Sequence, residues 1–326
     1  MTMRLRVEAV RSSLLWRLNT RIIARGVKSL PPDTLKSYIV VTPHLVHLAP
    51  LATLNHGPRV QPVLVANGLS EADITWLSEM TDAPVIRLKS SLGRSPDSLL
   101  AHGTIIDYLA DTNPGAFCIQ DADCFISDQS FWNSVNIDLS SEYAVCAFVR
   151  NGDGDRADFP ETFLTILNAP LMREYRRNHD VTSESSSRVS PRAQQALSEA
   201  GYPAGRVLET LKDYYDTLQQ FWVVATHHGF RFRQIPGEGS TVHHIGGTSY
   251  LYRAFDNLDH WDYWPLAVHY LNLRILESPK TSVFRQRFAG LFEFHGSADQ
   301  LLIKYPAFAS GWRRQTSERI IAALLR

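Results

Sequence analysis

The sequence is poor in cysteine, has no long apolar run and carries no excess charge of either sign. Its three cysteines, Cys118, Cys124 and Cys146, form no C-x-x-C pair, and a reducing compartment is the simplest inference. No stretch approaches the roughly 20 apolar residues that span a bilayer, and the N-terminus lacks the apolar core of a secretory signal. Lys plus Arg and Asp plus Glu both total 33, so no charge bias indicates nucleic acid as a partner. We therefore expect a protein on the cytoplasmic side.

The sequence does contain enough apolar material for a substantial core. Its 326 residues are 44% hydrophobic and 10% aromatic, which is typical of a globular protein with one large domain or one domain with extensions. We expect three parts: a basic N-terminal helical segment over residues 1–36, a main domain over 37–250 and a helical extension packed on it over 251–326.

The N-terminal segment differs from the rest of the chain in charge. Residues 1–30 carry seven basic side chains against a single acid, Glu8. Spacings of three and four predict a helix over 4–25, with the apolar stripe Val7, Val10, Leu14, Leu18 and Ile22. Three arginines share the side of this stripe: Arg11, Arg21 and Arg25. Three interpretations stay open: packing on the protein's own body, peripheral docking at the inner face of an anionic membrane, and an organellar transit peptide.

Strands and helices alternate after this segment. Short apolar runs predict strands, and Ser70 with Glu71 and Asp73 predicts the start of a helix. This alternation indicates an α/β fold with a largely parallel, doubly wound sheet. Ligands of such sheets bind at the carboxyl ends of the strands, where we expect Asn67, Arg94 and Asp121 to cluster. The expected strands are 38–41, 62–65, 84–88 and 116–119, and a helix is expected over 97–111.

The second half is less regular. Residues 178–195 are rich in serine, contain Pro191 and predict a mobile loop. The acidic run 151–158 lacks the closing glutamate of a calcium loop and is interpreted as a solvated turn. The remaining expectations are strands over 143–149, 162–167 and 230–235, a helix over 205–228 that stops at Gly229, and helices over 251–326.

Two carboxylates one residue apart, Asp121 and Asp123, follow the apolar run 116–119. Side chains two apart at a strand end point the same way, so both carboxylates can converge on one cation. Two such groups about 4 Å apart repel by roughly 1 kcal/mol in water and by more in a cleft, and a divalent ion removes that conflict. Oxygen ligands suit Mn²⁺ or Mg²⁺, which commonly hold a substrate's phosphates. The pair therefore predicts a metal site for a diphosphate; as an alternative, the acids serve as turn formers or helix caps.

Adjacent histidines form a second landmark about 120 residues later. His243 and His244 precede Gly246 and Gly247, and glycine permits a close approach of the backbone to a ligand. Neighbouring residues of a strand point to opposite faces, so at most one of the two histidines is expected to face the same ion.

Three features follow one another along the chain: a strand that ends at Asp121 to Asp123, a helix that ends at Gly229, and the segment from Val242 to Ser249. Together and in this order, they resemble GT-A-fold glycosyltransferases. The likeness is greatest to family 2 and its rhamnosyltransferase-like members, and it covers roughly residues 37–250. The resemblance implies a GT-A-type, Rossmann-like sheet that binds a nucleotide sugar. It implies that Asp121 and Asp123 bind Mn²⁺ or Mg²⁺ and the donor diphosphate, with a metal or diphosphate role for His244, or else for His243.

The chain departs from the family pattern at two places. Ala66 replaces the acid that commonly contacts the base, so the resemblance leaves the identity of the base open. The Glu-Asp pair that supplies a catalytic base in inverting members has no clean equivalent, which leaves Asp216 or Asp213 as candidates and the stereochemistry open. We expect Asp216 first, because it lies closer to the apolar run 221–225.

Further contacts are expected around this core. Asn67 and Arg94 are candidate donor ligands, and the aromatic residues Trp261, Tyr263 and Trp264 are candidates for a wall that stacks on the acceptor. The leading hypothesis is a metal-dependent hexosyl- or deoxyhexosyl-transferase. It would move a sugar from a nucleotide-diphosphate donor to a glycan, glycolipid or other hydroxyl acceptor of a cell-surface polysaccharide. The alternatives are a nucleotidyltransferase on a related fold and a non-catalytic carbohydrate-binding or scaffold protein.

Overall fold

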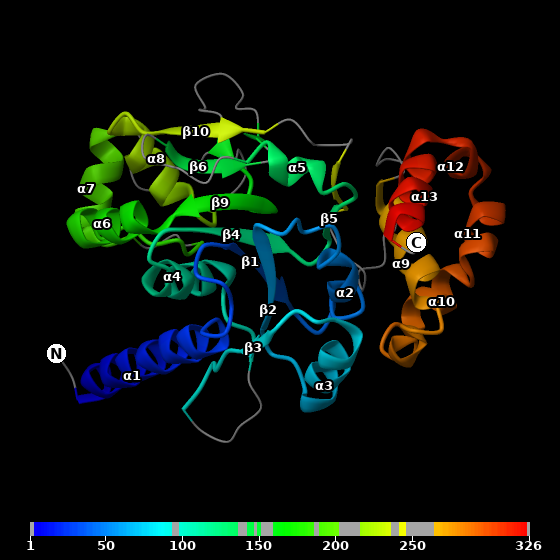
Figure 1. The fold of residues 1–326 in the computed structure, drawn as a ribbon, viewed down its shortest axis with the longest axis horizontal. Helices are drawn as coiled ribbons and strands as arrows, with labels where there is room; N and C mark the ends of the chain where they lie inside the picture. The colour runs from blue at the N-terminus through cyan, green and yellow to red at the C-terminus, as the bar shows by residue number, and fades with distance from the viewer. Residues whose placement is uncertain are drawn as a thin grey trace.

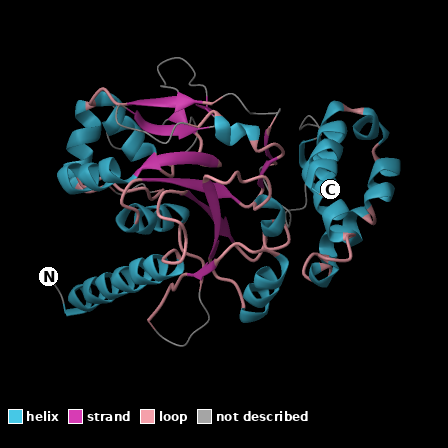
Figure 2. Ribbon diagram, viewed as in Figure 1, coloured by secondary structure: helices cyan, strands magenta, loops and turns pink. Residues whose placement is uncertain are grey.

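A sheet with helices on both faces dominates the computed structural model (Figures 1 and 2). The structure describes residues 3–92, 98–135, 142–146, 149–150, 159–185, 189–201, 216–235, 241–245 and 264–324.

The central sheet has seven strands in the order β10-β6-β9-β4-β1-β2-β3. Strand β9 is antiparallel to both of its neighbours, whereas the other pairings in this sheet are parallel. This doubly wound, mostly parallel arrangement confirms the expected fold class. The strands are β1 (Leu35–Val41), β2 (Val60–Ala66), β3 (Val85–Arg87), β4 (Ala116–Asp121), β6 (Glu142–Cys146), β9 (Leu164–Asn168) and β10 (Arg231–Gln234).

Two short antiparallel pairs lie beside this sheet. Strand β5 (Cys124–Ile126) pairs with β11 (Val242–His244), and β7 (Val149–Arg150) pairs with β8 (Phe159–Pro160). The first pair brings the segment with the two histidines directly against the chain that leaves β4. Residues more than 100 positions apart in sequence therefore meet at one end of the sheet.

Alternation along the strands separates two apolar cores. In β1, Tyr38 and Val40 belong to one core, and Ile39 and Val41 belong to the other. The first core is covered by α1 (Met3–Gly26), α4 (His102–Thr112), α6 (Ala169–His179), α7 (Pro191–Glu199) and α8 (Gln219–His227). The second is covered by α2 (Ala49–Ala52), α3 (Glu71–Met80), α9 (Trp264–Leu276), η3 (Ser282–Phe284), α10 (Ala289–His295), α11 (Ala298–Lys304), α12 (Pro306–Ser310) and α13 (Trp312–Leu324).

A third buried cluster fills the space under β5 and the short helix α5 (Ser130–Asn133). The three cysteines expected to be reduced are buried and free. Two of them, Cys118 and Cys124, belong to this cluster, where they pack as small apolar side chains.

The C-terminal helices contact the main domain through polar groups as well as through the second core. His47 Nε2 lies 2.6 Å from Asn272 Oδ1, and Arg287 pairs with Asp73 at 2.8 Å. The helical character expected for 251–326 is confirmed over its described part, 264–324. The boundaries between the three expected parts stay predictions.

Two expectations from the sequence are wrong in detail. The expected loop 178–195 contains the end of α6 and the start of α7, because Ser190 caps the helix and Pro191 occupies its first turn, where proline is well tolerated. The helix expected over 205–228 is interrupted: α8 begins only at Gln219, after Leu218 at φ 66°. Residues 205–215 of that segment lie outside the described residues.

Helix α1 has the expected extent but not the expected packing face. Ile23 is fully buried against the first core, whereas Val10, Leu14 and Leu18 of the expected apolar stripe are exposed. Among the described helices, none combines the length and the apolar character needed to cross a membrane.

Candidate active site

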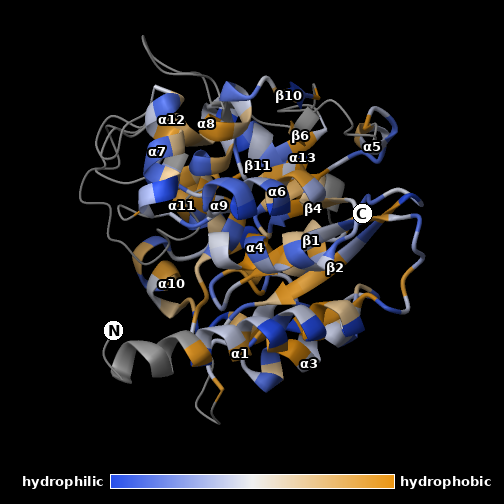
Figure 3. Cartoon of the chain, turned by 90° about the vertical axis from the view of Figure 1, so that its left-hand side faces the viewer, coloured by the Kyte–Doolittle hydropathy of each residue, from blue (hydrophilic) through white to orange (hydrophobic). Residues whose placement is uncertain are grey.

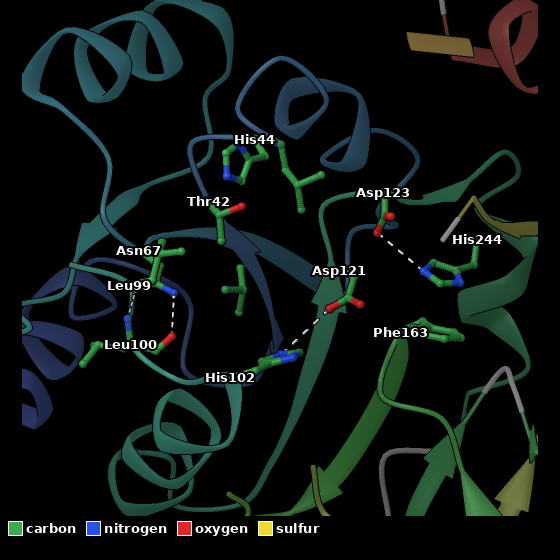
Figure 4. Close-up of a pocket in the computed structure, with 12 residues that line it drawn as sticks. Thr42, His44, Asn67, Leu99, Leu100, His102, Asp121, Asp123, Phe163 and His244 are labelled. Atoms are coloured by element: carbon green, nitrogen blue, oxygen red, sulfur yellow. Dashed lines mark hydrogen bonds and ion pairs between the residues drawn. The ribbon is translucent and has the colours of Figure 1, made fainter. Parts of the chain in front are cut away.

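The carboxyl ends of β1, β2 and β4 meet at one edge of the sheet, and a cavity of about 360 Å³ lies there (Figure 4). Its volume is that of a small-molecule site, and its place is where doubly wound sheets bind ligands. The lining residues come from all three strand ends, from α4 and from β11: Val40, Thr42, His44, Leu45, Asn67, Leu99, Leu100, His102, Asp121, Asp123, Phe163 and His244.

Asp121, Asp123 and His244 lie together at one end of this cavity. Asp121 is the last residue of β4, and Asp123 follows in the turn before β5. Because β5 pairs with β11, His244 lies opposite Cys124 and is carried to the same turn. One ligand atom from each of the three side chains falls within 4.8 Å of the others, and His244 Nε2 is 3.5 Å from Asp123 Oδ1. Two oxygens and one nitrogen at this separation can hold a divalent ion.

The electrostatics of this group favour a positive charge. Burial, together with the neighbouring charges of Asp123 and Glu161, raises the pKa of Asp121 to about 7, although His244 opposes the shift. Burial lowers the pKa of His244, but its hydrogen bond to Asp123 and the nearby acids outweigh that effect and raise the pKa above its ordinary value. Three acids thus act around one imidazole in a site shielded from water. A bound cation would relieve their repulsion.

The two adjacent histidines are separated by the alternation of the strand. His244 stacks on Phe163, with ring centroids 3.4 Å apart, and faces the cavity. His243 is 8% exposed, and its Nε2 lies 3.1 Å from Ser127 Oγ. The expectation that at most one histidine faces the carboxylates is met in the geometry, and that histidine is His244.

Asn67 lines the cavity, as expected, but its amide is engaged with the backbone. Its Nδ2 donates to the Leu100 carbonyl at 3.0 Å, and its Oδ1 accepts from the Leu100 N–H at 2.8 Å. This two-way bond fixes the segment before α4, which forms part of the cavity wall. A direct contact between Asn67 and a donor stays a prediction.

His102 was not expected from the sequence. It opens α4, and its Nε2 lies 3.8 Å from Asp121 Oδ1. Burial lowers the pKa of His102 to about 4, and the charge of Asp216 acts in the opposite direction. His102 therefore lies beside a candidate metal ligand and is influenced by the charge of the candidate base. No pattern in the sequence singles it out, because its helix was expected to begin five residues earlier, at 97.

The segment 181–185 joins these parts. The Ser183 carbonyl accepts from the Leu218 N–H at 3.0 Å, which fixes the chain just after Asp216. The same carbonyl lies so close to α4 that a Cβ added to Gly103 would be 2.2 Å from it. Ser183 Oγ donates to Asp107 at 2.7 Å, deeper in α4. The start of α8, with Asp216, is thereby held against the start of α4, with His102.

Thr42 and His44 also line the cavity and were missed as site residues. They follow β1 directly, so the argument from strand ends that selected Asn67 and Asp121 selects them too. Four other candidates, Arg94, Asp213, Trp261 and Tyr263, lie outside the described residues. Trp264 opens α9, and only its backbone is described.

Comparison with known proteins gives the class. Residues 17–172 match the family model described as the StrH glycosyltransferase N-terminal domain, and this range includes both site carboxylates and His102. The resemblance to glycosyltransferases is thereby confirmed, and the match supports glycosyl transfer as the kind of activity. The narrower likeness to family 2 is not confirmed. No curated protein matches the chain.

Among solved structures, the glycosyltransferase GlyE of Streptococcus pneumoniae is similar at 10% identity and a TM-score of 0.42, over 79% of this chain and 64% of that chain. Its apo form gives the same values. A 4-diphosphocytidyl-2C-methyl-D-erythritol synthase of Anaerococcus prevotii is similar at 10% identity and a TM-score of 0.36, over 64% of this chain and 89% of that chain. The chain thus spans somewhat less than two thirds of the length of GlyE.

Proposed function

We propose that the protein transfers a sugar from a nucleotide-diphosphate donor to a hydroxyl of a glycan or glycolipid, with Mn²⁺ or Mg²⁺ as cofactor. The observation that carries the proposal is the convergence of Asp121, Asp123 and His244 in one cavity at the carboxyl edge of the sheet. Both acids lie within the segment that matches a glycosyltransferase domain. The transferred group is proposed to be a hexosyl or deoxyhexosyl group.

The donor set fits a divalent metal. Asp121, Asp123 and His244 would hold the ion, and the raised pKa of Asp121 marks a carboxylate whose charged form needs a nearby cation. An imidazole nitrogen beside two carboxylates favours Mn²⁺ over the harder Mg²⁺. When bound, the ion offsets the negative charge that develops on the diphosphate leaving group.

The remaining residues act on orientation and on the proton. The acceptor oxygen forms a bond to the anomeric carbon of the donor sugar as the bond to the diphosphate breaks, and the hydroxyl proton passes to Asp216. His102 is a positioning residue: its Nε2 lies 3.8 Å from Asp121 Oδ1, and it would orient that carboxylate for the transfer.

The opposite end of the cavity suits the nucleoside part of the donor. Leu99 and Leu100 supply apolar surface there, and Thr42 adds a hydroxyl (Figure 4). A flat nucleobase is bound well between apolar walls that carry few polar groups. Acceptor contacts by Trp261, Tyr263 and Trp264, and a phosphate contact by Arg94, remain part of the proposal.

The test is a donor panel. Purified protein is incubated with individual nucleotide sugars, with Mn²⁺, with Mg²⁺ or with EDTA, and the release of nucleoside diphosphate is measured. We expect release from one donor or a few related donors, abolished by EDTA and by Asp121→Asn. Metal-dependent release of pyrophosphate from a nucleoside triphosphate and a sugar phosphate would instead identify a nucleotidyltransferase. If both assays are silent and a sugar still raises the melting temperature, the protein is a binding module.

A further inference from the structure

Helix α1 has two distinct faces, and one of them is fixed on the protein. Trp16 Nε1 donates to Asp111 Oδ2 at 2.8 Å. Asn19 exchanges two hydrogen bonds with the backbone of Lys89, at 2.9 and 2.8 Å, and Ile23 is fully buried. These contacts set the rotation of the helix about its axis, so the side chains that point away from the body are fixed as well.

The outward face mixes apolar and basic side chains. Val10, Leu14 and Leu18 are 59%, 48% and 36% exposed. At 100° per residue these three fall within one arc of the helix, on the side away from Asn19. Four arginines occupy the same arc and are exposed: Arg11, Arg17, Arg21 and Arg25.

No acidic side chain offsets the positive charge of this face. Between Val10 and Lys28 the sequence contains neither Asp nor Glu. The helix runs along the lower edge of the molecule in Figure 1, and hydrophobic and hydrophilic residues mix over its coloured part in Figure 3. An exposed helix that combines leucines and valine with an unbalanced row of arginines has the composition of helices that lie in the headgroup region of a bilayer.

We propose that this outward face of α1 docks on an anionic phospholipid surface, with the arginines at the lipid phosphates and Val10, Leu14 and Leu18 among the upper acyl carbons. A second copy of the chain is a poor occupant, because four like charges would face four others. Nucleic acid would use the arginines but would leave the three apolar side chains in water. The lipid surface is the partner that satisfies both kinds of side chain.

The test uses the full chain and needs no donor, so it is independent of the proposed function. Binding to sucrose-loaded vesicles is measured by sedimentation, with phosphatidylcholine alone and with phosphatidylcholine containing about 30% phosphatidylserine. We expect binding to the anionic vesicles only, weakened by salt. The variant with Arg11, Arg17, Arg21 and Arg25 replaced by glutamine should bind on the order of 100-fold more weakly, because each basic residue near an anionic surface contributes several-fold to the binding constant.

Matched controls separate the helix from general effects. A second quadruple glutamine variant removes the same charge elsewhere, at the exposed residues Arg59, Arg192, Arg231 and Lys280. It should bind within about threefold of the wild type. The double variant Leu14→Ser and Leu18→Ser should weaken binding about tenfold. Its control replaces Val283 and Ile303, which are 66% and 78% exposed, with serine and should bind as the wild type does. All variants should keep the melting temperature of the wild type, since they alter exposed side chains.

Three outcomes would overturn the proposal. One is an absence of binding to anionic vesicles at low salt. Another is equal loss of binding in both quadruple variants, which would make the attraction a property of overall charge. The last is binding of the wild type to nucleic acid but not to vesicles, which would assign the arginines to a different class of partner.

Discussion

The buried carboxylate of α4 and the acids that end β4 have different kinds of partner. Asp107, in the middle of α4, is 4% exposed; it lies 3.6 Å from Arg176 and accepts a hydrogen bond from Ser183. Asp121 and Asp123, at the end of β4, are influenced among the described residues by each other, by Glu161 and by His244. The acid in the helix has an arginine from a neighbouring helix, whereas the acids at the strand end lie beside imidazoles: His244 is 3.5 Å from Asp123, and His102 is 3.8 Å from Asp121.

The comparison separates an acid that has an internal partner from a pair of acids that a cation would neutralise. Burial raises the pKa of both Asp107, to about 6, and Asp121, to about 7. For Asp107, burial raises the pKa more than Arg176 and Ser183 lower it, so the net shift is upward. For Asp121 a second acid adds to the effect of burial. A permanent internal partner stabilises one site, and the other retains an excess of negative charge that an ion from solution can balance.

The largest expected effect comes from breaking the strand-end pair. Asp123→Asn should reduce metal-dependent transfer about 1000-fold, because the loss of a metal ligand removes several kcal/mol of charge stabilisation from the reaction. The rate of nucleoside diphosphate release measures this loss. The matched control is Asp128→Asn, an exposed acid five residues further on that accepts a bond from the Ser130 backbone. If both variants retain the wild-type rate, the pair does not hold a catalytic metal.

A cation should stabilise the strand-end site and leave the acid in α4 unaffected. At a concentration 100 times its dissociation constant, Mn²⁺ should raise the free energy of unfolding by about 2.7 kcal/mol. Differential scanning fluorimetry with Mn²⁺ and then excess EDTA detects this as a reversible rise in melting temperature. Asp107→Asn should retain the rise, and Asp121→Asn should abolish it. A rise of equal size in both variants would place the ion elsewhere.

The free energy of unfolding should depend on pH through the titration of Asp107. Because the folded-state pKa of Asp107 lies above the unfolded value, the native state binds its proton more tightly, and stability falls as pH rises from about 4 through 6. Asp107→Asn lacks this titration. Its free energy of unfolding relative to the wild type should therefore rise by about 2 kcal/mol between pH 4 and pH 7, as measured by urea denaturation. A difference that does not change with pH would show that Asp107 stays charged throughout.

The smallest effect is expected at the uncharged side of the cavity. Asn67→Ala removes two hydrogen bonds to the Leu100 backbone and should lower stability by about 1 to 2 kcal/mol. The KM for the donor should rise several-fold, while the metal concentration that gives half-maximal activity should stay the same. A change in metal dependence as large as that of Asp123→Asn would contradict the separation of the cavity into a charged and an uncharged end.

The sequence allowed accurate prediction of the parts whose signals are local. The apolar runs of β1, β2 and β4 and the cap at Ser70 reproduce the observed elements, and the pair Asp121 and Asp123 lies where a strand end was expected. The resemblance preferred His244 over His243, but the residue pattern alone left the choice open, because it depends on the register of β11 against β5. Register between distant strands is a tertiary property that one strand's composition does not encode.

Two of the errors have the same cause, which is contacts with residues distant in sequence. The outward stripe of α1 has good helical periodicity, but the packing face is set by Trp16 and Asn19, which find partners in α4 and next to β3. His102 was missed because its importance comes from its neighbours in space. The prediction of a loop around Pro191 overlooked that proline is well tolerated in the first turn of a helix. This is a local rule that could have been applied.

At Gly103 two segments beside the cavity approach so closely that no side chain fits between them. Any side chain there would overlap the backbone of Ser183 and Glu184, and that backbone also holds the start of α8. A single methyl group would thus push apart the start of α4, which carries His102, and the segment that fixes the chain after Asp216. The proposed catalytic arrangement depends on an absent side chain, and Gly103→Ala is a natural choice for a temperature-sensitive variant that folds when cold and loses its site before its core on warming.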